Sequence, residues 1–133
     1  TDGAASNNSL NMFETMKCAA LLQSQFRWDP TAISAKQMLK CATVNGAKAL
    51  GINSGVIAEG KLADITILSL DANLRPANEK TLVNALVYSA NPANVKHVII
   101  NGKVVLRDGK ITAFDEEKVL GEFEKRAGRL LSD

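Results

Sequence analysis

Two runs of aliphatic residues around an Asn-Gly pair constrain the fold of this chain more than any other feature. Val98-Ile99-Ile100 precedes Asn101-Gly102, and Lys103-Val104-Val105-Leu106 follows it. Both turn residues tolerate the positive φ angles of a tight two-residue turn, so the pattern predicts a β-hairpin. Asp108-Gly109 predicts a second turn into Lys110-Ile111-Thr112. With a strand expected over 63–70, these segments predict a small antiparallel meander.

Three helices are expected around this sheet. In the first, Leu10–Phe26, apolar residues recur at three- and four-residue intervals, with Asn8 or Ser9 as the N-cap. The second, Ser34–Leu50, begins with a capping-box pair and ends at Gly51. Near Val44-Asn45, Gly46 is a possible break in its pattern. The face expected to be buried in the first helix is Leu10, Phe13, Met16 and Ala20.

The third helix is expected over 115–131, with acidic residues first and basic residues last, as the helix dipole favours. The face that we expect it to bury comprises Val119, Leu120, Phe123, Ala127, Leu130 and Leu131. In the predicted strand, Ile65 and Ile67 are expected to point inward. The segment Leu82–Tyr88 fits a strand or a helix equally well. The fold class predicted from these patterns is α+β.

Charge and composition exclude several classes of function. Among 133 residues the formal net charge is +2, which gives no electrostatic reason to expect nucleic acid or an anionic membrane as a partner. Every apolar run is shorter than a membrane span, and the first residues lack the order of a secretory signal. Cys18 and Cys41 have no metal or redox spacing, and we expect reduced, packed thiols in a cytoplasmic protein.

Few side chains suggest chemistry by themselves. Asp2-Gly3 lies in a polar, turn-prone segment that usually serves only as a turn. His97 is the single histidine and has no second ligand at metal spacing, so we interpret it as a strand-end residue. The glycines match no phosphate-binding loop. Without further comparison, the residues indicate a soluble α+β unit.

Several stretches taken together resemble a known family. They occur in this order: Thr1-Asp2-Gly3-Ala4-Ala5-Ser6-Asn7-Asn8, Ala42-Thr43-Val44-Asn45-Gly46-Ala47-Lys48-Ala49-Leu50-Gly51, Gly55-Val56-Ile57-Ala58-Glu59-Gly60-Lys61-Leu62-Ala63-Asp64 and Val98-Ile99-Ile100-Asn101-Gly102-Lys103-Val104-Val105. The set resembles the C-terminal part of metal-dependent amidohydrolases. Within them it is most similar to 5-methylthioadenosine/S-adenosylhomocysteine deaminases, with chlorohydrolases and guanine or cytosine deaminases as relatives.

The resemblance implies an architecture and a site. The family has a (β/α)₈ barrel and a small β-sandwich built from both chain ends. Residues 1–54 would then be the helical end of the barrel, 55–112 the C-terminal share of the sandwich and 113–133 a terminal helix. Asp2 matches the aspartate that follows the eighth barrel strand, which binds the metal and transfers a proton. Zinc is the divalent metal that the resemblance leads us to expect first.

The same resemblance implies that the other metal ligands and the substrate-binding residues lie on strands outside this chain. We therefore expect the 133-residue chain to be inactive alone and to bind no metal tightly. In the intact enzyme it would act, with the N-terminal barrel segment, on a small purine nucleoside or related base. An unpaired sheet edge also leads us to expect a homo-oligomer. Two alternatives stay open: a separate non-catalytic interaction module, and an enzyme whose N-terminal part stays bound after cleavage.

Overall fold

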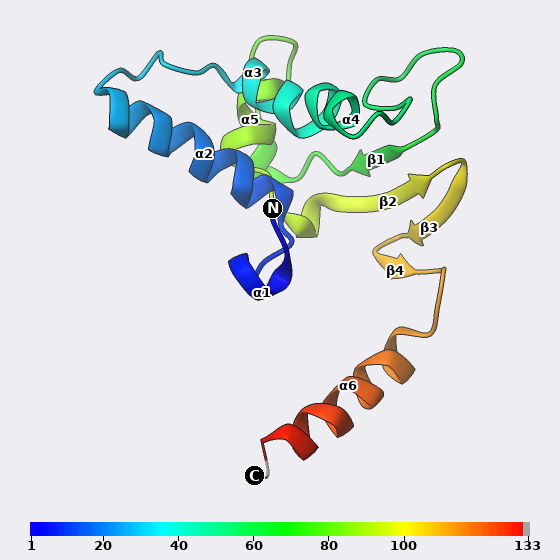
Figure 1. Ribbon diagram of the computed structural model, residues 1–133. Coiled ribbons are helices and arrows are strands. Elements are labelled where there is room, and N and C mark those ends of the chain that lie inside the picture. The colour runs from blue at the N-terminus through cyan, green and yellow to red at the C-terminus, as the bar shows by residue number, and fades with distance from the viewer. Residues whose placement is uncertain (132–133) are drawn as a thin grey trace.

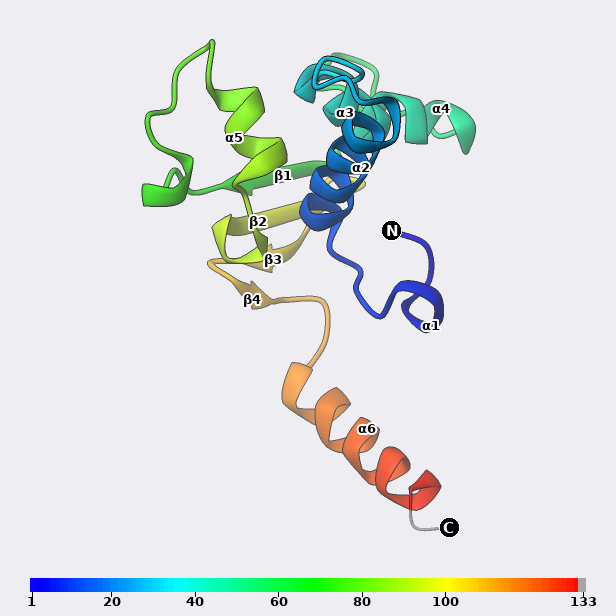
Figure 2. The same cartoon turned by 90° about the vertical axis from the view of Figure 1, so that its left-hand side faces the viewer.

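The computed structural model describes residues 1–131 and shows an antiparallel sheet with a group of helices beside it (Figure 1). Helices α2 to α5 gather on one side of the sheet, whereas α6 extends away from it (Figure 2). The elements are α1 (Ala4–Asn7), α2 (Met12–Arg27), α3 (Ala35–Lys40), η1 (Cys41–Asn45), α4 (Gly46–Ala49), β1 (Ile65–Leu68), η2 (Ala72–Leu74), α5 (Leu82–Tyr88), η3 (Pro92–Asn94), β2 (Val95–Ile100), β3 (Lys103–Arg107), β4 (Lys110–Ile111) and α6 (Glu116–Leu130).

The predicted meander is confirmed. The strand order is β1-β2-β3-β4, and every neighbouring pair is antiparallel. Ile100 pairs with Lys103 across the tight turn, where Asn101 and Gly102 have φ angles of 48° and 76°. These positive angles are the reason that the sequence places Asn-Gly there. The second turn repeats the arrangement at Asp108-Gly109.

The inward direction that the sequence suggested for Ile67 is wrong. Ile67 is 44% exposed, whereas its neighbours Thr66 and Leu68 line a groove beside the helices. Ile65 lines the same groove as well, and the pairing with β2 is irregular between Ile67 and Leu68, so strict alternation does not hold along β1. Ile65 is half-buried. The burial along β1 does not alternate, so the period-2 pattern alone could not predict which of its side chains lie beside the helices.

The main core lies where α2, α3 and α5 meet. Met16 and Ala20 of α2 are buried there, as the sequence predicts, and Phe13 packs against them. Leu10, in contrast, is 67% exposed. It precedes the helix, because the N-cap is Asn11, whose side chain accepts from the amides of Phe13 and Glu14, and not Asn8 or Ser9. The other buried members of this core are Ala35, Met38 and Val87.

The second predicted helix is present but is not regular throughout. Ser34 and Gln37 form the capping box, which confirms the predicted start. The chain stays helical through a π-helical stretch at Cys41–Asn45, so Gly46 begins α4 and does not break the helix. Gly51 has φ 67° just beyond the last turn, as expected for a residue that ends a helix. The ambiguous segment Leu82–Tyr88 is a helix.

The two cysteines are free but exposed, so the prediction that they are packed is wrong. Cys18 lies two residues after the buried Met16, and such a separation places side chains on nearly opposite sides of a helix. Cys41 lies in the π-helical stretch, where no residue is buried. Apolar neighbours in the sequence did not predict the burial of these two cysteines, because only one face of each helix is covered.

The third helix is confirmed, with Asp115 as its N-cap, but its expected burial is wrong. Val119, Phe123 and Leu130 are 52%, 67% and 82% exposed. Leu120 and Leu131 are exposed as well, and Ala127 is half-buried. No element among residues 1–131 packs along α6, which the two views show standing clear of the sheet (Figures 1 and 2). The periodicity predicted the apolar face correctly, but among residues 1–131 no element covers it.

Candidate functional site

Asp2, the predicted site residue, lies in a folded segment at the start of the chain. Its φ angle is 59°, which is uncommon for a residue other than glycine. Asp2 Oδ1 accepts a hydrogen bond from the Gly3 amide at 2.8 Å, and the Thr1 hydroxyl donates to the Asp2 carbonyl oxygen at 3.0 Å. The Asp2 side chain is exposed. These bonds hold its backbone, while Oδ2 accepts no hydrogen bond from the described residues.

The segment that follows folds back on Asp2. Residues 4–7 form one turn of helix, α1, where the sequence predicted only a polar turn. Asn7 Nδ2 donates to the carbonyl oxygens of Thr1, at 3.0 Å, and Ser9, at 3.3 Å. Asn8 ends the turn in the left-handed conformation. The polar residues of this segment therefore fix the path of the chain around Asp2.

The described residues do not form a complete metal site. Among residues 1–131, no group of three His, Cys, Asp or Glu side chains lies close enough to hold a metal ion. Asp2 brings one carboxylate, whereas a catalytic zinc ion is normally held by about three protein ligands. This carboxylate fits the role of a single ligand. The remaining ligands of any such site would have to come from outside the described residues.

His97 has a local structural role in this fold. It lies inside β2, opposite Ile67, and its side chain is 33% exposed. Its Nδ1 accepts from the Asp108 amide at 3.3 Å, and Nε2 lies 3.6 Å from Asp108 Oδ1. The imidazole thus joins β2 to the turn after β3. The interpretation of His97 as a strand-end residue is therefore wrong, because the residue lies within β2 and not at either end of it.

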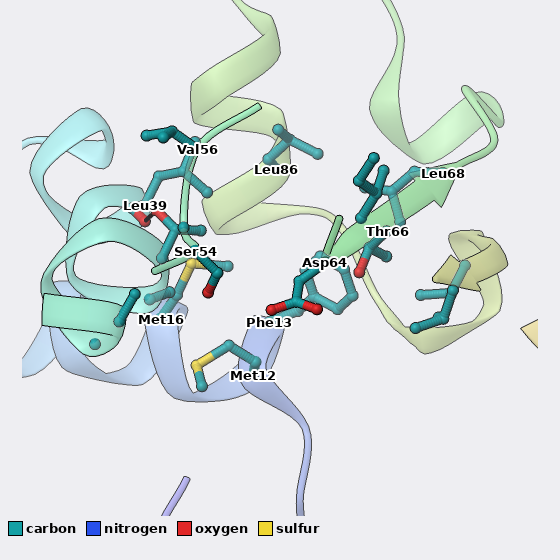
Figure 3. Close-up of a pocket in the computed structure, with 18 of the residues that line it drawn as sticks. Met12, Phe13, Met16, Leu39, Ser54, Val56, Asp64, Thr66, Leu68 and Leu86 are labelled. Atoms are coloured by element: carbon teal, nitrogen blue, oxygen red, sulfur yellow. Dashed lines mark hydrogen bonds between the residues drawn. The ribbon is translucent and has the colours of Figure 1, made fainter. Parts of the chain in front are cut away.

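An apolar groove of about 880 Å³, which no sequence pattern predicted, lies between the helices and the sheet (Figure 3). Met12 and Phe13 of α2, Leu86 of α5 and Leu68 of β1 line it. Asp64 places a carboxylate at its edge, and Asp64 Oδ1 accepts from the Asn101 amide at 2.8 Å. The groove forms because segments distant in sequence meet around it, which no local pattern encodes.

Comparison with known proteins identifies the family. The model of the amidohydrolase family matches residues 1–105. This chain belongs to the amidohydrolase family. Its membership confirms the resemblance that the ordered sequence stretches indicated. The match contains Asp2, the helices α2 to α5 and the hairpin formed by β2 and most of β3.

Relatives with related activities extend the match beyond the family model. The chain is 44% identical over 133 residues to a 5'-deoxyadenosine deaminase of Methanosarcina barkeri, covering 99% of this chain and 30% of that protein. It is 44% identical over 126 residues to a 5-methylthioadenosine/S-adenosylhomocysteine deaminase of Pyrococcus furiosus, covering 94% of this chain and 30% of that protein. The chain thus spans about 30% of the length of these relatives.

A solved structure supports the fold. An adenosine deaminase from Xanthomonas campestris, crystallised with bound zinc, superposes with a TM-score of 0.90 and 32% identity. The superposition covers 98% of this chain and 30% of that one. The four-stranded sheet and its helices are therefore an arrangement found in amidohydrolases. Within residues 1–131, no helix has the length and apolar character that a membrane span requires.

Proposed function

We propose that this chain is the C-terminal portion of an enzyme that hydrolytically deaminates a purine nucleoside or a related base. The observation that carries the proposal is the identity of 44% to a 5'-deoxyadenosine deaminase over 99% of the chain. The second deaminase relative and the solved adenosine deaminase support the same class of small-molecule substrate. Because the chain spans about 30% of these proteins, most of the site would be supplied by other residues.

Asp2 is the catalytic and metal-binding residue that we propose for this chain. In such an enzyme a divalent metal ion, with zinc as our first candidate, lowers the pKa of a bound water. The exposed carboxylate of Asp2 is suited to accept a proton from that water and to return it to the departing amine. The hydrogen bond to the Gly3 amide and the folded segment 1–9 would hold the carboxylate in place. The other ligands of the proposed metal site would come from outside the described residues.

The proposed architecture follows the resemblance. Residues 1–54 would end the barrel, 55–112 would form the C-terminal share of a β-sandwich, and 113–133 a terminal helix. Two features support this division. β1 pairs with β2 alone in the described part of the chain, so its other edge is available to a further strand. The neighbouring groove is lined mostly by apolar side chains that would be buried by such an addition.

The free edge of β1 also supports a second proposal, that copies of this chain associate through it. Unpaired N–H and C=O groups on a sheet edge are a template for pairing with another strand. The predicted homo-oligomer therefore stays a prediction. A non-catalytic interaction module would bind its partner through the same free edge of β1. Mass measurement of the purified chain over a range of concentrations would separate a monomer from such an assembly.

The catalytic proposal is tested in a fusion in which the part of the Methanosarcina barkeri relative that precedes its matching region is joined to Thr1. Asp2→Asn keeps an oxygen that can accept from the Gly3 amide but removes the charge and the basicity. We expect it to lower kcat for deamination of 5'-deoxyadenosine by about 100-fold or more. Glu59→Gln, the same chemical change in an exposed loop, serves as the matched control. Unchanged kcat for Asp2→Asn would refute the role of Asp2.

A further inference from the structure

Helix α6 carries an apolar stripe that nothing in the described chain covers. Leu120, Phe123, Ala127 and Leu130 are spaced by three, four and three residues, which places them along one face. Leu120, Phe123 and Leu130 are 53%, 67% and 82% exposed. A free helix of 15 residues is only marginally stable in water, since most helical stability in proteins comes from packing an apolar face. A covering surface is therefore needed to keep α6 helical.

The charges of α6 argue against a membrane as that surface. The helix carries four acidic and four basic side chains, so its charges cancel. Glu117 and Glu124 border one side of the stripe, and Arg126 and Arg129 lie toward the other. Glu122 lies beside Arg126, with Oε2 3.9 Å from Nε. Helices that lie on anionic lipid carry a strongly basic polar face, which is absent here.

The same charges argue against pairing of α6 with α6 of a second copy. In an antiparallel pair, the side of the stripe that carries the two glutamates would lie against the same side of the other helix. Glu117 and Glu124 would then face Glu117 and Glu124 of the second copy, and the like charges would repel. In a parallel pair, Glu124 would lie opposite Val119, and Arg126 opposite Leu131. Neither arrangement forms an ion pair between the helices. The flanks suit a different surface, one that has basic groups near the two glutamates.

The comparison with the solved adenosine deaminase indicates where such a surface lies. Its superposition covers 98% of this chain, which takes in α6, at a TM-score of 0.90. α6 therefore projects from the sheet at a similar angle in a protein of which this chain matches only 30%. A helix without packing partners has nothing to fix that angle. The relatives and the solved structure are about three times as long as the matched region, so each contains a large further stretch of polypeptide that could supply such a surface.

We propose that α6 is a docking helix, whose stripe binds the part of the longer polypeptide that precedes Thr1. The inference rests on the proposed function, which supplies that polypeptide. Phe123, in the middle of the stripe, is the anchor. The receiving surface is apolar, with basic groups facing Glu117 and Glu124. α6 thereby fastens the chain to the rest of the protein at a place remote from Asp2 in sequence.

Amide hydrogen exchange of α6 tests this, measured in the 133-residue chain and in the fusion described above. We expect the α6 amides to exchange at least about tenfold more slowly in the fusion, because packing suppresses local opening. Phe123→Ser in the fusion should restore fast exchange. Lys125→Ser, on the opposite side of the same helix, should leave the protection intact. Amides of α2 report in the same experiment that the fusion is folded.

Three results would overturn the proposal. Equal exchange of α6 in the chain and the fusion would mean that nothing before Thr1 covers it. Equal loss in both serine variants would mean that the stripe is not the contact. Protection that rises with the concentration of the isolated chain would assign the stripe to a second copy. If the fusion does not fold, the corresponding helix of the intact Xanthomonas enzyme is compared before and after the same substitutions.

The docking proposal and the proposed function can fail separately. Unprotected α6 in a fusion that deaminates 5'-deoxyadenosine would overturn the docking alone. Protected α6 in a fusion whose activity survives Asp2→Asn would overturn the role of Asp2 alone. The readouts are independent because Phe123 and Asp2 belong to different elements, and among the described residues no backbone hydrogen bond joins α6 to the segment 1–9.

Discussion

The helices α2, α3 and α5 and the helix α6 all carry an apolar face, yet only the first three cover one another. Met16, Met38 and Val87 are at most 8% exposed where the three helices meet. Phe123, in the middle of the apolar face of α6, is 67% exposed. In both regions the sequence shows the same pattern, in which apolar residues recur at intervals of three and four. An apolar periodicity shows that a face needs a partner, and it does not say whether that partner lies in the same chain.

The difference in burial between the α2–α3–α5 core and α6 predicts its largest effect on the free energy of unfolding when one side chain is truncated in each region. Met16→Ala should destabilise the 133-residue chain by about 2–5 kcal/mol, because it removes buried methylene groups and leaves a cavity. Phe123→Ala should change the free energy of unfolding by less than about 0.5 kcal/mol, as is usual for an exposed site. Urea unfolding followed by circular dichroism measures both. Equal losses would contradict the contrast and place Phe123 in a packed core.

A smaller but still substantial effect is expected at Gly55, where the loop before β1 touches the helical region. A Cβ there would lie 2.9 Å from Val44 Cα and 3.0 Å from the Thr43 carbonyl oxygen, and φ is +89°. Gly55→Ala should therefore cost about 2–4 kcal/mol of unfolding free energy. Gly60→Ala is the control, since φ is +75° but no atom lies within 4 Å. Thermal melting should separate the two variants, and coincident melting curves would refute the close approach.

The N-caps of α3 and α6 allow a further comparison, in which the expected change in unfolding free energy is about 1 kcal/mol. Ser34 Oγ accepts from the Gln37 amide at the start of α3, and Asp115 Oδ1 accepts from the Lys118 amide at the start of α6. Ser34→Ala should lower the stability of the packed helices by about 1 kcal/mol. Asp115→Ala should reduce helical content without moving the urea midpoint. A shift of that midpoint in Asp115→Ala would mean that α6 unfolds together with the core.

The smallest expected effect is a pH dependence at Asp71, an exposed residue between β1 and η2. The Ser69 hydroxyl donates to Asp71 Oδ2 at 2.6 Å and, as the main cause, holds the pKa of that carboxyl below its ordinary value. The ionised form is thus favoured by folding. Its contribution is complete above the unfolded pKa of about 3.9 and is lost as the pH falls through the lower folded pKa. The stability difference between the natural chain and Asp71→Asn should shrink between pH 6 and pH 2.5.

Local chemistry explains which parts of the fold could be predicted from the sequence. Asn101-Gly102 fixes the hairpin because the turn needs two positive φ angles, and Ser34 with Gln37 fixes the start of α3 through mutual hydrogen bonds. Each device acts within four residues. The N-cap of α2 was placed wrongly because Asn8, Ser9 and Asn11 all have suitable side chains. Only the path of the folded segment decides among them.

Features that depend on distant partners could not be predicted. The exposure of Phe123 and the direction of Ile67 depend on which surfaces lie nearby. The groove beside β1 needs several elements to meet, among them α2, α5 and β1 itself. Asp2 was found only through the resemblance to amidohydrolases, because a lone Asp-Gly pair in a polar turn has no specific chemistry. The role of Asp2 stays a prediction, while membership of the amidohydrolase family is established by the match over residues 1–105.

Native mass spectrometry of the purified 133-residue chain, with the mass of any metal resolved, tests most directly whether its site depends on residues outside it. We expect a subunit of 14.2 kDa, alone or as a homo-oligomer, without stoichiometric metal even after incubation with zinc. One tightly held zinc ion per chain, together with deamination of 5'-deoxyadenosine by that same sample, would contradict it. Such a result would show that Asp2 and its neighbours form a complete metal site by themselves.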